Sequence, residues 1–211
     1  RIGVEPSTAM AVIARQRGIQ VVRAVAEKLP FRDEAFDVAL LITTLCFLDD
    51  VELCFQESHR VLQPGGCFLV GFIDAQSRCG QAYQRHRTES RFYGEAQFYP
   101  AGEVVSRLAS AGFGDFASVQ TICDPSLGSA SPQPIHPGYG EGCFVVIRGM
   151  KPTRPFGDGR RNGDGIFNGQ DESARRSSGG DDSPAALLRS MCKMHASHFA
   201  IAGAGLSCIM H

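Results

Sequence analysis

The chain has 211 residues and a formal net charge of −1 at pH 7, so its bulk field favours neither a polyanion nor a membrane surface. No apolar run is long enough to cross a bilayer, and the N-terminus lacks the basic-then-apolar pattern of a secretion signal. We therefore expect neither nucleic acid nor a membrane as a partner. The length allows one domain with a real core, with or without a tail.

Eight cysteines is a high count, but most of them lie inside apolar runs such as TTLCFL, GCFLVGF and GCFVVI. Buried free thiols behave as small hydrophobic side chains, whereas disulfide frameworks are more usual in short secreted chains. The cysteines therefore predict free thiols in a reducing, cytoplasmic setting.

The first part of the chain predicts strands and helices in alternation. A Ser/Thr start with apolar residues at helical spacing predicts a helix over 7–17, and Pro64-Gly65-Gly66 ends a second one predicted over 50–62. Short apolar or β-branched runs predict strands over 1–5, 19–26, 36–45 and 67–74. This alternation predicts crossover connections and an α/β fold with a doubly wound, mostly parallel sheet.

The second part of the chain changes character twice. Residues 75–98 are more polar, and we expect them to cover a pocket. A helix over 101–111 and strands over 116–123 and 143–149 predict an antiparallel hairpin at one sheet edge. After Lys151 large apolar residues are few, which predicts a folded domain over 1–150 and a low-complexity, disordered tail over 151–211.

The stretch GVEPS, residues 3–7, places the lone carboxylate of Glu5 at the end of a strand and directly before a helix. A carboxylate at this place often accepts both ribose hydroxyls of a nucleotide in an open α/β sheet. An ordinary strand end with a solvated acid is the alternative, and these five residues alone leave both open.

Two further motifs follow in order: AEKLPFRDEAFDVAL at 26–40 and ESHRVLQPGG at 57–66. Together with GVEPS they resemble the class I S-adenosylmethionine-dependent methyltransferases, in particular the small-molecule branch. The resemblance covers about residues 1–149. It implies a Rossmann-like sheet with a C-terminal antiparallel hairpin, S-adenosylmethionine as cofactor, and methyl transfer to a small-molecule acceptor by in-line displacement.

The resemblance also assigns residues to the cofactor. It implies that Glu5 binds the ribose, that Pro6 lies against the adenine face, and that the Ala26 N–H meets the adenine edge. Val25 stands where many relatives have an aspartate, so the contact to the adenine amino group is missing or falls to Glu27 or to backbone. A solvated loop acid is the alternative for Glu27.

The end of the strand over 36–45 completes these assignments. The resemblance places Thr43 at the cofactor, while 44–47 leads into the acceptor pocket. The RVLQPGG motif is interpreted as architecture, with Arg60 pairing with Glu57 at i,i+3. No catalytic residue is assigned, because Asp74, Tyr83, His86 and Tyr93 are each interpreted as capping, packing or solvated groups.

The sequence departs from the family at its beginning. Only four residues precede Glu5, whereas the family places a strand and a glycine-rich turn roughly 20 residues before the ribose acid. We therefore expect the first strand and the glycine loop to be absent, the sheet to have an open gap, and the chain as given to bind the cofactor poorly. These absences predict that the chain is a fragment of an active enzyme, truncated at its N-terminus.

Two patterns in the tail resemble metal sites. Residues 162–171 resemble part of a calcium loop, but Arg160 stands at the first ligand position, where an anion is needed. Five residues have spacings that zinc tolerates without forming a finger pattern: Cys192, His195, His198, Cys208 and His211. We therefore predict no metal.

Two other functions remain open from the sequence. A nucleotide-dependent oxidoreductase can share the ribose-binding acid, and a degenerate fragment or interaction module would lack the cofactor loop and have no activity. The sequence gives no prediction of oligomeric state.

Overall fold

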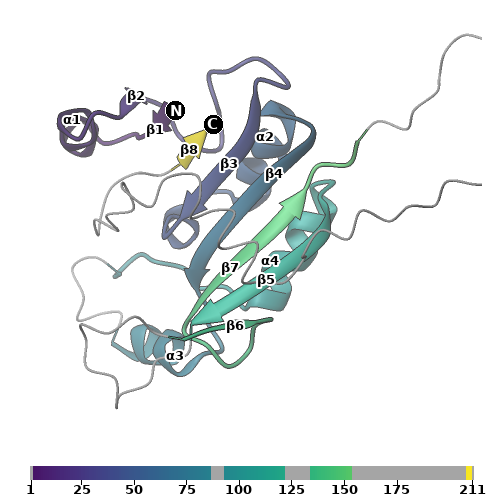
Figure 1. Cartoon of the computed structure of the whole chain (residues 1–211). Helices are drawn as coiled ribbons and strands as arrows, with labels where there is room; N and C mark the ends of the chain where they lie inside the picture. The colour runs from purple at the N-terminus through teal and green to yellow at the C-terminus, as the bar shows by residue number, and fades with distance from the viewer. Residues whose placement is uncertain (1, 87–92, 122–133, 154–207, 211) are drawn as a thin grey trace, which may run out of the picture.

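One mixed sheet organises the part of the chain that the computed structural model describes, which is residues 2–86, 93–121, 134–153 and 208–210. The strand order is β2-β1-β8-β3-β4-β7-β5-β6 (Figure 1). The strands are β1 Ile2–Val4, β2 Gln20–Val22, β3 Phe36–Ile42, β4 Leu62–Ile73, β5 Gly114–Thr121, β6 Ile135–Pro137, β7 Phe144–Met150 and β8 Cys208–Met210. The helices are α1 Thr8–Gln16, the 3-10 turn η1 Leu45–Phe47, α2 Val51–Val61, α3 Arg78–Arg85 and α4 Ala101–Ser110.

The pairing confirms the predicted fold class. β1 runs parallel to β2, and β3 runs parallel to β4, as crossover connections require. β7 lies antiparallel to both β4 and β5, which is the predicted hairpin arrangement at one side of the sheet. β7 ends at Met150, next to the predicted boundary. That residues 151–211 form a separate tail stays a proposal.

Local chemistry sets the helix ends. The Ser7 hydroxyl accepts the N–H of Met10 at the start of α1, and the Asp50 carboxylate accepts the N–H of Leu53 at 2.9 Å at the start of α2. β4 begins directly after α2, and its pairing with β3 jumps from Leu62 to Cys67. The Pro-Gly-Gly turn is therefore a bulge within β4, where Gly65 takes a φ of +80°.

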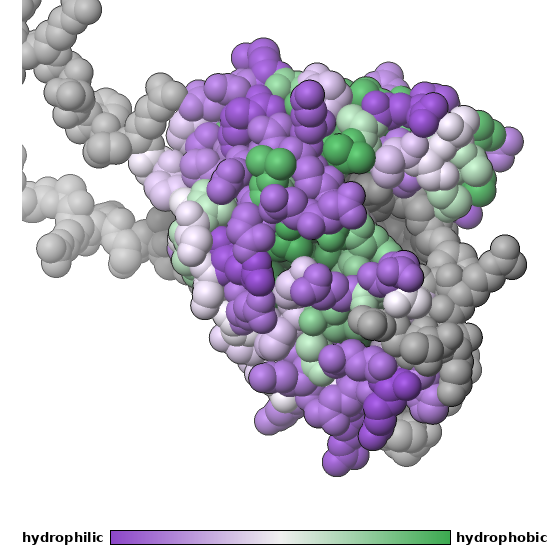
Figure 2. All heavy atoms as spheres, turned by 180° about the vertical axis from the view of Figure 1, so that it is seen from behind, coloured by the Kyte–Doolittle hydropathy of each residue, from purple (hydrophilic) through white to green (hydrophobic). Residues whose placement is uncertain are grey.

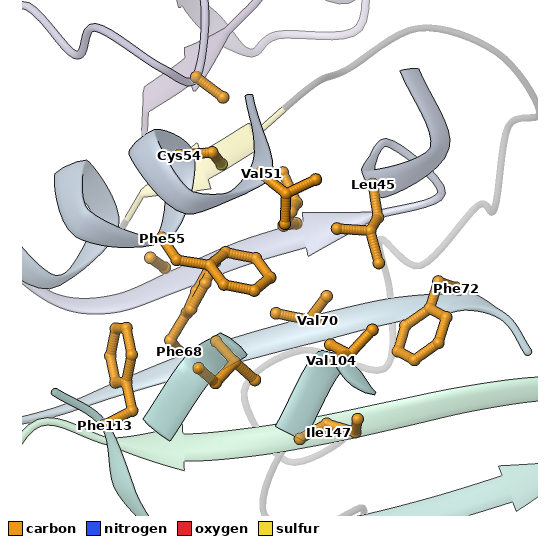
Figure 3. Packing of buried hydrophobic residues seen from close by; sticks show 14 of the residues in the cluster. Leu45, Val51, Cys54, Phe55, Phe68, Val70, Phe72, Val104, Phe113 and Ile147 are labelled. Carbon is orange, nitrogen blue, oxygen red and sulfur yellow. The ribbon is translucent and has the colours of Figure 1, made fainter. Parts of the chain in front are cut away.

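The hydrophobic core lies between the sheet and the helices α2 and α4, which pack side by side on one of its faces (Figures 1 and 3). Phe55 of α2 meets Phe68 of β4 edge to face, with ring centroids 5.8 Å apart. Arg107 of α4 pairs with Glu52 of α2 at the outer rim. The large buried side chains therefore lie where α2 and α4 cover the sheet.

Four elements were not predicted. The predicted strand over 36–45 ends at Ile42, and Leu45–Phe47 form the 3-10 turn η1. In α3, Gly80 is the buried residue and packs against the Asp74 carbonyl, so the helix lacks an apolar stripe. β6 is a short, exposed strand. β8 occupies the position between β1 and β3, antiparallel to both. The prediction of an open gap is therefore wrong, because residues 208–210 of the predicted tail occupy that position in the sheet. The rest of the tail after 153 lies outside the described residues, and the calcium-like and zinc-like patterns fall there except for Cys208.

The prediction of free thiols is wrong for one pair. Cys79 of α3 forms a disulfide with Cys143, just before β7, and their Cα atoms are 5.4 Å apart. That separation lies within the range a disulfide needs. Cys46, Cys54 and Cys67 are not disulfide-bonded. The cytoplasmic setting, which rested on reduced cysteines, stays a prediction. None of the described helices is both long and apolar enough to span a membrane.

Candidate functional site

The carboxyl ends of β1 and β3 share one edge of the sheet. Both strands run antiparallel to β8, so they run parallel to each other and end on the same side. Glu5 follows β1 and Thr43 follows β3, two strand spacings apart, which is roughly 10 Å. This is the edge at which ligands bind in open α/β sheets.

Glu5 is almost completely buried, with 4% of its surface exposed. Its carboxylate accepts the N–H of Ser7 at 2.8 Å, and its own N–H donates to the carbonyl of Val22. The alternative of a solvated acid is therefore wrong. Its neighbour Pro6 is exposed, and the Pro6 carbonyl accepts a bond from Arg23. Their roles toward ribose and adenine stay predictions.

The loop after β2 contributes three of the predicted cofactor residues. Val25 is exposed, whereas Ala26 is buried in the core cluster. The Glu27 carboxylate accepts the backbone N–H of Asp49 at 3.0 Å. Glu27 is thus tied to the segment before α2 and is not simply a solvated loop acid. Contact of these residues with adenine stays a prediction.

Arg60 of α2 binds the loop that connects β2 to β3. It pairs with Glu57, as predicted, and also with Asp33 at 2.8 Å. It donates further bonds to the carbonyls of Leu29 and Phe31. The Arg60 guanidinium lowers the pKa of the Glu57 carboxyl. These contacts make the RVLQPGG motif architecture that holds the loop in place.

Thr43 turns the chain from the end of β3 into η1. Its φ is +55°, which is unusual for a β-branched residue and costs about 1–3 kcal/mol. Its N–H donates to the carbonyl of Gly71 on β4, and its hydroxyl donates to the carbonyl of Ile42. The strained turn is therefore held from two sides, as is common where the backbone forms part of a site.

A hollow opens beside this turn. The ends of β3 and β4 supply one side, with Thr43, Leu45, Cys46, Phe72 and Ile73. The opposite side is the segment 93–100, which supplies Tyr93, Gln97, Phe98 and Tyr99. Figure 2 shows a recess of apolar surface among polar side chains on the face opposite to that of Figure 1.

Two backbone hydrogen bonds fix segment 93–100 over the strand ends. The N–H of Gln97 donates to the carbonyl of Cys46 at 2.9 Å, and the N–H of Ala75 donates to the carbonyl of Tyr99 at 3.1 Å. The prediction that residues 75–98 cover a pocket agrees with the described part of that range.

Four aromatic rings form one side of this region, and we call them the aromatic wall: Phe47, Tyr83, Tyr93 and Phe98. Tyr93 contacts each of the others, with centroid distances of 6.0 Å to Phe47, 5.0 Å to Tyr83 and 5.9 Å to Phe98. The rings come from η1, α3 and the segment 93–100. The wall therefore links three elements that are separate in the sequence.

The titratable side chains of the hollow are kept neutral. Burial raises the pKa of the Cys46 thiol to about 11. Burial also raises the pKa of the Tyr93 phenol and that of the Tyr99 phenol. At pH 7 these groups contribute hydrogen-bonding capacity without formal charge.

The four residues interpreted from the sequence as capping, packing or solvated groups, which are Asp74, Tyr83, His86 and Tyr93, are brought together only in part. Tyr83 and Tyr93 meet in the aromatic wall. Asp74 is 1% exposed, and its carboxylate accepts the N–H groups of Gln76 and Ala101, so it caps a turn and the start of α4. His86 closes α3. Asp74 is therefore a structural cap, as interpreted from the sequence.

The sequence did not indicate Phe72, Ile73 and Tyr99 as lining residues, and it indicated Gln97 and Phe98 only as members of the range 75–98. For Phe98 and Tyr99 the available signal was aromatic side chains next to a polar stretch. The described residues contain no group of three or more His, Cys, Asp or Glu side chains arranged for a metal.

Comparison with known proteins gives consistent results. The family described as "Methyltransferase domain" matches residues 1–70. An uncharacterized protein of Methanocaldococcus jannaschii is 40% identical over 151 residues, which cover 72% of this chain and 73% of that protein. A crystal structure from Thermotoga maritima, described as a SAM-dependent methyltransferase and possible histamine N-methyltransferase, is 44% identical with a TM-score of 0.69, and the match covers 72% of each chain. The demethylmenaquinone methyltransferase of Chlorobaculum tepidum is 37% identical over 70 residues, 32% of this chain and 29% of that protein.

Proposed function

The chain belongs to the S-adenosylmethionine-dependent methyltransferases, and on this premise we propose that it methylates a small molecule held in the hollow beside Thr43. S-adenosylmethionine is the cofactor of this family. The observation that carries the proposal is the common edge of β1 and β3, where the family's ribose acid and the rim of the hollow lie on the same side of the sheet.

The residues at this edge fit the adenosine half of the cofactor. Glu5 offers a carboxylate, the preferred partner of two adjacent hydroxyls. Ala26 is small enough for a ring to approach its backbone, and Thr43 lies between this edge and the hollow. Groups for the methionine half are not found among the described residues. When bound, the cofactor supplies a methyl group on a sulfonium, which is already activated for in-line displacement.

The protein's part in the reaction is positioning. Cys46, Tyr93 and Tyr99 stay neutral at pH 7, and the described lining contains no carboxylate or imidazole that could serve as a general base. Holding the acceptor in line with the reacting bond supplies a large part of the rate in such reactions. Thr43 and Gln97 can orient polar atoms of the acceptor by hydrogen bonds.

A small acceptor is supported by the relatives. Histamine and demethylmenaquinone, which appear in the names of two relatives, are both small molecules. The comparisons found methyltransferases, which gives the oxidoreductase alternative no support.

Calorimetric titration of the full chain with S-adenosylhomocysteine tests the proposal. Because the glycine loop is absent from this chain, we expect weak but saturable binding. Glu5→Gln should weaken it further by about tenfold, because a neutral amide accepts hydroxyl hydrogen bonds less strongly than a carboxylate. Glu103→Gln, on the exposed face of α4, is the matched control and should bind like the wild type. If the folded wild type shows no binding, the proposal fails and the non-catalytic alternative gains.

A further inference from the structure

The hollow is uncharged on every described side. Its aliphatic and phenylalanine side chains include Leu45, Phe72 and Phe98, and its polar groups are hydroxyl, thiol and amide. Arg107 lies outside this lining. Arg107 sits over the ring of Tyr99 at 5.3 Å and is paired with Glu52 and Glu103. The carboxylates of α2 and α4 therefore already balance the charge of Arg107.

This lining discriminates against ions. A carboxylate or phosphate that entered the hollow would lose water without finding an opposite charge among the described lining residues. An ammonium would meet the same loss. Ring faces attract cations, but this attraction is smaller than the cost of burying an ammonium without an opposite charge.

The same wall favours a flat ring. Aromatic rings prefer offset-stacked or edge-to-face neighbours with centroids roughly 4.5–7 Å apart, and a further ring beside Tyr93 and Phe98 extends the existing pattern. Both of these residues line the hollow as well as belonging to the wall. A saturated ring of the same size gains apolar contact without this geometry.

We propose that the hollow selects an uncharged, flat, aromatic acceptor, which packs against Tyr93 and Phe98. That the bound ligand is a methyl acceptor rests on the proposed function. The preference for an uncharged aromatic ligand rests only on the residues that line the hollow. It names a substrate class, with charge state and planarity as the selected properties.

Three matched probes test the charge selection: 2-naphthalenemethanol, 2-naphthoate and 2-naphthylmethylammonium. They share one ring system and differ in being neutral, anionic and cationic. Binding to the full chain at pH 7 is measured by saturation-transfer NMR and by calorimetry. We expect the alcohol to bind about tenfold more tightly than either ion. Tighter or equal binding of an ion, or no binding of any probe, overturns the proposal.

Planarity and location are tested with one more probe and with two variants. Decahydro-2-naphthalenemethanol has a similar size without aromatic rings and should bind more weakly than 2-naphthalenemethanol. Phe98→Leu removes a wall ring and keeps apolar bulk, so we expect it to weaken binding of 2-naphthalenemethanol about fivefold. Tyr139→Leu, an exposed ring outside the wall, is the control and should leave binding unchanged. Equal loss in both variants, or none in Phe98→Leu, contradicts the assigned location.

Circular dichroism of both variants checks that they are folded, and the wild-type probe series gives a result even if Phe98→Leu does not fold. Titration with S-adenosylhomocysteine separates the two proposals. A chain that binds the neutral probe but not S-adenosylhomocysteine retains the pocket chemistry and refutes the methyltransferase role. A chain that binds S-adenosylhomocysteine but prefers an ionic probe refutes only the substrate class.

Discussion

The two halves of the sheet are built differently. On one side of β8, the strands β3, β4, β5 and β7 are seven or more residues long and are covered by α2 and α4. On the other side, β1 and β2 have three residues each and pack with α1. The only strand between these halves in the described sheet is β8, also three residues long.

The two halves of the sheet differ in what they contribute: one contains most of the large buried side chains, and the other contains the proposed ribose ligand. Large side chains with no exposed surface, such as Phe55, Phe68 and Leu108, lie in the covered half. Glu5, which we propose as the ribose ligand, lies at the end of a short strand in the other half. The hollow sits at the carboxyl ends of β3 and β4, on the rim of the covered half. We therefore expect unfolding to be governed by one half and cofactor binding by the other.

Phe55→Ala should show the largest effect on stability. The side chain is fully buried between α2 and β4, so its loss leaves a cavity and lowers the free energy of unfolding by about 3–5 kcal/mol. Val22→Ala, in the half-buried β2, should lower it by about 1 kcal/mol or less. Urea denaturation followed by circular dichroism measures both. Equal losses would contradict the division into two unequal halves.

Glu57→Gln should have an intermediate effect that depends on pH. Glu57 accepts hydrogen bonds from Arg60 and from the N–H of Leu29, and its loss should cost about 1.5–3 kcal/mol at pH 7. The pKa of Glu57 is lowered in the folded state, so the carboxylate stabilises the fold fully above its ordinary value of 4.5. That stabilisation is lost as the pH falls from there through the folded-state pKa.

The difference in unfolding free energy between wild type and Glu57→Gln should therefore shrink on acidification, measured by urea denaturation between pH 7 and pH 3. Glu103→Gln is the control, because its exposed i,i+4 pair with Arg107 is worth only about 0.5 kcal/mol. A difference for Glu57→Gln that stays constant with pH would mean that the loop does not depend on the ionised pair.

The sequence predicted those parts of the fold that depend on local patterns. The helix over 7–17 follows from side-chain periodicity and a capping Ser7, and the strand over 36–45 follows from an apolar run. Both signals are visible within one segment. The Arg60–Glu57 pair follows from helical spacing alone. The three motifs indicated the family because each is local and their order is fixed by the chain.

What the sequence did not predict depends on contacts between distant segments. Cys79 and Cys143 are 64 residues apart, and nothing in either segment indicates that their Cα atoms meet. The aromatic wall brings Phe47 and Tyr83 together through Tyr93, a pairing that no spacing rule contains. The helix α3 was not predicted because its buried residue is Gly80, which packs against backbone, and the helix has no apolar stripe.

The smallest expected effect on global stability concerns β8, which joins the two halves. Ile209 pairs with Gly3 of β1 on one side and with Leu40 of β3 on the other. Ile209→Pro removes its N–H from the ladder and introduces a ring that a central strand does not accommodate. Because β8 is so short, we expect the free energy of unfolding to change by about 1 kcal/mol or less.

Hydrogen exchange can detect what global unfolding does not. Amides of β1 and the β8-facing amides of β3 should exchange faster in Ile209→Pro, whereas amides between β4 and β7 should keep their protection, because those strands pair without β8. Ile209→Ala keeps the backbone N–H and should leave the exchange pattern nearly unchanged. If Ile209→Pro instead lowered protection across the whole sheet, β8 would belong to the same cooperative unit as the covered core, and the division into two halves would not hold.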